Sequence, residues 1–90
     1  MNKSDLVNTI AEKSDLSKIE VESIVDEFLR LIEKGVLKGE EVKISNFGVF
    51  YKKARLARKG TNPSDGSPIV IPANNTLGFR PSKVLKEKMN

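Results

Sequence analysis

The segment from Lys52 to Asn75 most constrains what this 90-residue chain can fold into. A basic run (YKKARLARK) leads to a turn sequence (GTNPSDG), and an extended run (SPIVIPANN) returns from it. Pro68 and Pro72 lack the N–H that a central strand needs, so the return run fits only an edge strand. The pattern predicts a two-stranded ribbon that is too long and too polar to lie inside so small a domain. Such a ribbon is marginally stable alone in water, so we expect a projecting arm that a binding partner holds in place.

The charge distribution indicates what kind of partner that is. Residues 1–51 contain seven Lys/Arg and ten Asp/Glu, a net charge of −3, whereas residues 52–90 contain nine and two, a net charge of +7. Five cations lie within the run that leads to the turn, with no acidic residue among them. A chain divided in this way is expected to bind a polyanion with its basic half.

Strand alternation assigns the arm cations to faces if the strand is regular. Side chains two residues apart then share a face. One face would carry Lys53, Arg55 and Lys59, and the other Lys52 and Arg58. Cations on both faces suit a groove between two rows of phosphates. The alternative is an edge strand whose charges serve only solubility.

The tip of the arm reads first as a turn. Asn62–Asp65 fits a type I turn with proline at its second position, and Gly66 is free to take a positive φ. Pro63 is also a rigid apolar residue at the end of a cationic arm. A wedge of this kind can enter a base step and kink a duplex.

The first part of the chain predicts two helices. Asn2 is a candidate N-cap, with Asp5 three residues on, and Ser17 with Glu20 forms a capping-box pattern. Apolar residues then recur at helical spacing until Gly39, which fits a helix C-terminus. The apolar stripe is wide for a lone small domain, so a second subunit is expected to cover it.

Strands and a short helix are predicted for the remainder. Glu41–Ser45 alternates, and after a break at 46–48 one long strand is expected to run up to Lys59. Thr76–Phe79 would complete a three-stranded antiparallel sheet. Ser82 could then cap a short basic helix.

Residue types that are absent narrow the function. The chain has no Cys and no His, which excludes disulfides and the usual nucleophile, acid–base and metal-ligand sets. The carboxylate pairs Glu40–Glu41 and Asp26–Glu27 are more simply solvated charges, so we expect no enzyme, no cofactor, no metal and no small-molecule substrate. No apolar run is long enough for a signal peptide or a membrane span, so a cytoplasmic protein without membrane contact is expected.

Three stretches, NFGVF, ARKGTNPSDG and GFRPSKVLK, resemble the HU and integration host factor family of bacterial histone-like DNA-bending proteins. The similarity runs from MNKSDLV to the C-terminus. It implies an α+β fold in an intertwined dimer, with a helical base, a three-stranded antiparallel sheet and a long two-stranded β-ribbon arm per subunit. The chain would be one domain (1–90), with a mainly helical dimerisation body (1–51), the arm (52–75), and a last strand and basic C-terminal helix (76–90).

The resemblance also implies site residues. The arm residues expected at DNA are Lys52, Lys53, Arg55, Arg58, Lys59, Thr61, Asn62 and Pro63, the last as an intercalating wedge. The body residues expected at phosphates are Lys3, Asn46, Arg80, Ser82, Lys83 and Lys86. The residues expected in the dimer core are Phe28, Phe47, Phe50 and Phe79.

The implied function is architectural. Such a protein binds the DNA minor groove with little sequence preference, bends the duplex and compacts the nucleoid. Its partners would be double-stranded DNA, especially bent, nicked or junction DNA, and a second copy or a paralogous subunit, with RNA left open. One alternative is a subunit like integration host factor that binds preferred sites, which FRPSKVLK favours. The other is a protein-interaction module whose ribbon adds to an acidic partner's sheet edge.

Some residues depart from the family pattern. Thr61 stands where most members have Arg, and Asp65 places a negative charge near the expected phosphates. Asn46 occupies a position usually held by Gly, and the return strand is uncharged at Ser67, Pro68 and Val70.

Overall fold

The structure is a computed structural model that describes all 90 residues. The chain has an α+β fold with three helices and five antiparallel strands, two of which form the outer part of a β-arm. Its residues cluster into an N-terminal unit, Met1–Lys34, and a C-terminal unit, Gly35–Asn90.

Helix α1 (Lys3–Lys13) begins at the predicted cap. The Asn2 side chain accepts a hydrogen bond from the Asp5 amide (2.9 Å), and the Asp5 carboxylate accepts one from the Asn2 amide (3.1 Å). This capping box satisfies two backbone donors that a helix N-terminus leaves unpaired. The acidic side chain in the first turn also complements the positive end of the helix dipole.

Helix α2 (Lys18–Leu37) begins after Ser17, whose Oγ accepts a hydrogen bond from the Glu20 amide (3.2 Å). At its end the Glu40 amide donates to the Gly35 carbonyl (3.0 Å) and the Gly39 amide to the Val36 carbonyl (2.9 Å). Gly39 has a φ of +84°. These bonds form a Schellman motif, so both predicted helix boundaries are confirmed.

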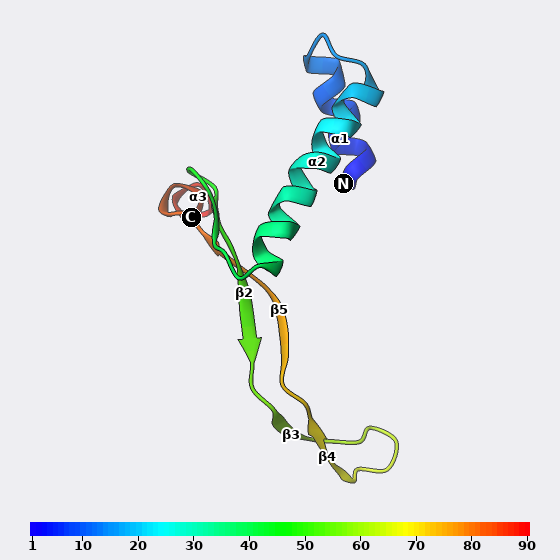
Figure 1. Cartoon of the computed structure of the whole chain (residues 1–90), viewed down its shortest axis with the longest axis vertical. Helices are drawn as coiled ribbons and strands as arrows, with labels where there is room; N and C mark the ends of the chain where they lie inside the picture. The colour runs from blue at the N-terminus through cyan, green and yellow to red at the C-terminus, as the bar shows by residue number, and fades with distance from the viewer. The chain divides into compact units, whose positions relative to one another are not determined.

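Strands β1 (Val42–Ile44), β2 (Gly48–Arg55) and β5 (Asn74–Pro81) form the predicted three-stranded sheet in the order β1-β2-β5. Figure 1 labels β2 and β5 of this sheet. The β1–β2 turn is closed by a hydrogen bond from the Phe47 amide to the Ile44 carbonyl (3.0 Å), and Asn46 takes a φ of 63° within it. Asparagine tolerates this left-handed conformation better than most residues.

Strands β3 (Arg58–Thr61) and β4 (Pro68–Ile71) pair with each other beyond the sheet, and we call this pair the outer ribbon (Figure 1). The prediction of one uninterrupted strand up to Lys59 is wrong. Pairing stops after Arg55↔Asn74 and resumes at Arg58↔Ile71. The interruption contains Pro72, which has no N–H to donate across the ribbon.

This break also removes the basis for assigning all arm cations to two faces. Alternation holds within each strand but cannot be carried across the interruption. Lys53 and Arg55 share a face of β2, opposite to Lys52. Arg58 and Lys59 are adjacent in β3 and therefore project to opposite faces of the outer ribbon.

Helix α3 (Lys83–Met89) follows the sheet directly. Ser82 caps it as predicted, because its Oγ accepts a hydrogen bond from the Leu85 amide (3.1 Å). The Ser82 amide in turn donates to the Phe47 carbonyl (2.8 Å), which ties the start of α3 to the β1–β2 turn.

Few apolar side chains are buried by the chain itself. Only Val7, Val21 and Val36 are buried hydrophobic residues. Helix α2 leaves Ile24, Phe28 and Leu31 more than half exposed. None of the helices is both long and apolar enough to cross a membrane.

Candidate nucleic-acid interface

The arm presents its cations to solvent. The side chains of Lys52, Lys53, Arg55, Arg58 and Lys59 are all exposed. None of them takes part in the chain's ion pairs, which involve Lys3, Arg30 and Arg80. The arm therefore carries unneutralised positive charge along both of its segments, as an interface for a polyanion requires.

The tip is a hydrogen-bonded loop in which Pro63 is exposed. The Asn62 amide donates to the Ser67 carbonyl (2.7 Å), and the Gly66 amide donates to the Asn62 carbonyl (2.7 Å). The Asn62 side chain also accepts from the Ser64 amide (2.9 Å). Gly66 has a φ of +74°, as predicted, while Pro63 is exposed and makes none of these bonds. Asn62 is thus committed to the turn, and the proline ring is the free apolar group.

Asp65 has a structural role in the same loop. Its Oδ1 accepts a hydrogen bond from the Ser67 amide (2.8 Å). Hydrogen bonds from the side chain and backbone of Ser67 lower the pKa of Asp65, so the carboxylate is ionised at neutral pH. The negative charge that departs from the family pattern is therefore a turn-forming group.

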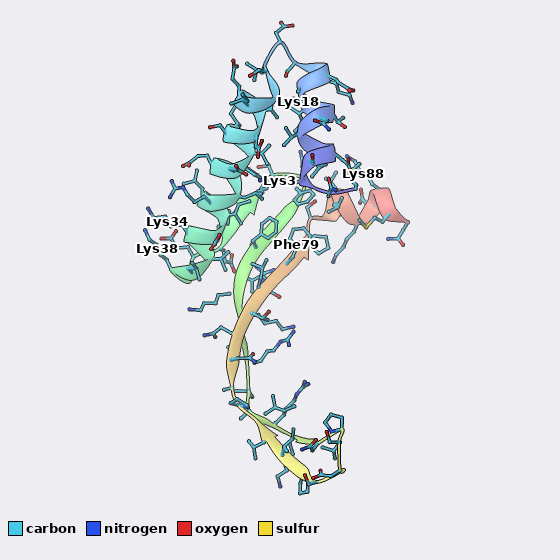
Figure 2. All side chains as sticks on the ribbon, turned by 90° about the vertical axis from the view of Figure 1, so that its right-hand side faces the viewer. Lys3, Lys18, Lys34, Lys38, Phe79 and Lys88 are labelled. Carbon is cyan, nitrogen blue, oxygen red and sulfur yellow. The ribbon has the colours of Figure 1, made fainter.

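Lys3 lies in the N-terminal unit and is paired with acidic residues of α2. Its Nζ is 2.7 Å from Asp26 Oδ1 and 3.9 Å from Glu22 Oε1. The hydrogen bond to Asp26 is the main cause that raises the pKa of Lys3. Lys3 and Lys18 line the same hollow of about 310 Å³ in this unit, and Figure 2 shows both labelled on the helices. Lys18 was not predicted as a site residue.

Two faces of the sheet have different chemistry. The register aligns Val42, Phe50 and Phe79 across the three strands, and it aligns Lys43, Val49 and Arg80 in the next row. Because alternate residues of a strand face opposite ways, the first row lies on an apolar face and the second on a basic one. Lys43 was also missed, although its place between two apolar residues in EVKIS was a usable signal.

Residues from both rows line an open hollow of about 530 Å³. Among the residues that line it are the cations Lys43, Arg80 and Lys86, together with Ser82. The structure thus brings three predicted body residues together with Lys43. Arg80 is not free, since its Nη2 is 3.0 Å from Glu41 Oε1 and its guanidinium lies 4.6 Å from the centre of the Tyr51 ring.

The other predicted body residues have separate positions. Lys83 is exposed at the first position of α3. Ser82 and Asn46 have clear structural tasks, one as a cap and the other in a tight turn. Their proposed contacts with DNA stay predictions.

Three of the predicted core aromatics form one cluster on the apolar face. Ring centroids are 4.9 Å apart for Phe50 and Phe79, 5.3 Å for Phe47 and Phe79, and 6.4 Å for Phe47 and Phe50. Phe47 and Phe79 nevertheless remain 44% and 39% exposed, and Figure 2 labels Phe79 on β5. Phe28 belongs to the N-terminal unit, where it is 51% exposed. Partly exposed aromatics of this size indicate a surface that a partner covers.

Comparison with known proteins identifies the family. The family model described as "Bacterial DNA-binding protein" matches residues 1–90. The chain belongs to this family. Among the relatives, DNA-binding protein HU of Staphylococcus aureus (strain COL) is 45% identical over 87 residues, which cover 97% of each chain. DNA-binding protein HU-1 of Halalkalibacterium halodurans is 41% identical over 90 residues, the full length of both.

Solved structures of the family share the fold. An Anabaena HU–DNA cocrystal structure superposes with a TM-score of 0.93 at 34% identity, covering 99% of this chain and 97% of that one. HU from Thermotoga maritima gives a TM-score of 0.69 at 30% identity over the full length of both chains. The expected membership of the HU-like DNA-binding family, and its α+β fold with a β-arm, are confirmed.

Proposed function

We propose that the protein binds duplex DNA along the minor groove with little sequence preference, and that it bends the duplex by inserting Pro63 into a base step. One observation carries this proposal: an exposed proline stands on a hydrogen-bonded tip at the end of an arm of exposed, unpaired cations. HU and integration host factor proteins insert apolar wedges into the minor groove, and we propose the same mechanism for this chain.

The tip geometry suits a wedge because it exists before DNA is bound. Hydrogen bonds across Asn62–Ser67 restrict the loop, and the pyrrolidine ring of Pro63 has a fixed φ. A preorganised wedge loses little conformational entropy on insertion. Unstacking a base step still costs a few kcal/mol, and bending a site of 20–30 bp by 40–90° costs of order 1–6 kcal/mol.

Contacts between cations and phosphates supply the energy to offset this cost. The arm offers Lys52, Lys53, Arg55, Arg58 and Lys59, and the body offers Lys43, Lys83 and Lys86 in addition to Lys3 and Arg80. Neutralising about 6–10 phosphates would make affinity fall roughly 10³–10⁵-fold between 50 and 200 mM salt.

The functional form is a dimer, in which two arms hold one duplex. The chain buries only three hydrophobic residues by itself, while Phe28, Phe47 and Phe79 remain substantially exposed. A second copy that covers these faces would supply the missing core. We favour a homodimer over pairing with a paralogue, because one chain already provides both the arm and the apolar faces.

Distorted DNA should be preferred over straight duplex. Bent, nicked or junction DNA has already lost part of its stacking, so less energy is spent on deformation. Structured RNA would compete to the extent that backbone contacts dominate. In the cell the protein would act in the cytoplasm on the nucleoid, which it helps to compact.

A gel-shift series tests the proposal. Linear, nicked and four-way-junction DNA of equal length are each titrated at 50 and 200 mM salt, with excess random duplex as competitor in a parallel set. We expect binding to all three, tightest to the nicked and junction forms, with a steep loss at the higher salt. A shallow salt dependence on duplex DNA would contradict the proposal. Resistance of one labelled site to random competitor would indicate a site-specific function instead, and binding only to an acidic protein would favour an interaction module.

A further inference from the structure

We propose that Tyr51 and Glu41 regulate how Arg80 binds DNA. In this proposal the Tyr51 ring orients the Arg80 guanidinium. Glu41 forms an ion pair with that guanidinium in the free protein, and a DNA phosphate replaces Glu41 when DNA binds. This inference rests on the proposed function, because it assigns two positioning residues to the same interface.

The sheet register brings Tyr51 to Arg80. Arg80 is directly opposite Val49, and Tyr51 is two residues further along β2 on the same face. The Arg80 Cζ lies 4.6 Å from the centre of the Tyr51 ring, inside the range of about 6 Å for cation–π attraction. The ring therefore offers the guanidinium a flat surface on which to stack.

Gly78 fixes the position of that ring. It is directly opposite Tyr51 in the β2–β5 pair and is buried. A Cβ atom at Gly78 would clash with three atoms of the Tyr51 ring. The ring thus lies over the backbone of β5 at the one position where no side chain obstructs it, and it is held there on the same face as Arg80.

Glu41 reaches the same guanidinium from just before β1, 39 residues away in the chain. Its Oε1 accepts a hydrogen bond from Arg80 Nη2 at 3.0 Å, while both side chains remain about half exposed. An exposed ion pair of this kind is weak. Phosphate is a strong acceptor that arginine can bind through two parallel N–H groups, so it can displace a single carboxylate oxygen.

The surroundings favour this exchange. Lys43 shares the row of Arg80 across the sheet, and Lys86 lines the same hollow. Two further cations that line the same hollow as Arg80 raise the local potential for a polyanion. Glu41 then acts as an internal competitor that reduces affinity, and Tyr51 keeps Arg80 oriented after the carboxylate has left.

Double-mutant cycles test the inference. Binding of a 20-bp duplex is measured for wild type, Glu41→Gln, Tyr51→Leu and Tyr51→Phe, each also in an Arg80→Ala background. We expect Glu41→Gln to tighten binding about two- to fivefold, because an exposed ion pair that no longer has to be broken contributes about that factor to the affinity. Tyr51→Leu should weaken binding by about the same factor, and Tyr51→Phe should leave it unchanged because the ring is kept. Both effects should disappear when Arg80 is absent.

A second readout uses the composition of the chain. Tyr51 is its only tyrosine and there is no tryptophan, so its ring resonances in an NMR spectrum are easily assigned. Adding duplex should shift these resonances in wild type but much less in Arg80→Ala. Thermal unfolding of every variant identifies any that lose their fold, and Tyr51→Phe serves as the folded control.

The outcomes separate the inference from the function on which it rests. If wild type binds duplex with a steep salt dependence but the effects of Glu41→Gln and Tyr51→Leu persist without Arg80, the inference is wrong and the proposed function stands. If wild type does not bind duplex at all, the proposed function is wrong and the inference falls with it.

Discussion

The arm tip carries two residues that are unusual for the family, and the structure shows where each lies. Asp65 and Thr61 depart from the family pattern, but each fits its backbone position. Asp65 closes the loop through Ser67, and Thr61 is a β-branched residue at the end of β3. Asp65 and Thr61 thus belong to the backbone structure that carries Pro63. The cations of the arm lie outside this loop.

The ionisation of Asp65 can be measured directly. Its hydrogen bonds to Ser67 lower its pKa below the ordinary value of 3.8. A lowered pKa means that the carboxylate stabilises the loop above pH 3.8, and that this contribution is lost as the pH falls through the folded-state pKa. We expect the carboxyl ¹³C resonance of Asp65 to titrate below 3.8, and to return towards it in Ser67→Gly. A wild-type pKa at or above the ordinary value would show that the carboxylate does not support the loop.

At the level of elements, local sequence signals predicted most of the fold. The three N-caps, the glycine that ends α2 and the change from helical to strand spacing are encoded by neighbouring residues, so these boundaries were confirmed. The sequence did not predict the interruption of the arm, because its place depends on which residues lie opposite Pro72. That pairing is set by the strand register, which neighbouring residues in the sequence do not determine. The contacts of Arg80 with Tyr51 and Glu41 were missed for the same reason. They join β5 to β2 and to the residue that precedes β1, which are far apart in the sequence.

Helix α3 offers a test of one predicted site residue. Ser82 was expected at phosphates, whereas its Oγ is used to cap α3. Replacing Ser82 with Ala should lower the free energy of unfolding by about 0.5–2 kcal/mol, the usual cost of losing an N-cap. Replacing it with Asn, which also caps helices, should largely preserve stability. Chemical denaturation of the three proteins measures this difference, and equal stabilities would show that the cap is dispensable.

At the scale of the whole molecule, the proposed function requires a second subunit. A chain of this size with three buried hydrophobic residues has too small a core to be stable alone. The partly exposed aromatic cluster Phe47–Phe50–Phe79 and the exposed side of α2 are the surfaces that dimerisation would bury.

In the proposed dimer, folding is coupled to dimerisation, so thermal stability should depend on protein concentration. Because dissociation accompanies unfolding, the Tm should rise by roughly 2–6 °C for each tenfold increase in protein concentration. Phe79→Ala should lower the Tm at every concentration, whereas the exposed-surface control Ser45→Ala should not. Calorimetry over a hundredfold range measures this. A Tm that does not change with concentration would indicate a stable monomer.

The bending angle of DNA tests the proposed role of Pro63 as a wedge. Energy transfer between dyes at the two ends of a 30-bp duplex is measured with wild type and with Pro63→Ala, on intact duplex and on the same duplex with a central nick. We expect wild type to bring the ends of the intact duplex closer together. Pro63→Ala should lose most of this bending while still binding the nicked duplex with affinity within a few-fold of wild type. Unchanged bending by Pro63→Ala would show that Pro63 is a turn residue only and does not act as a wedge.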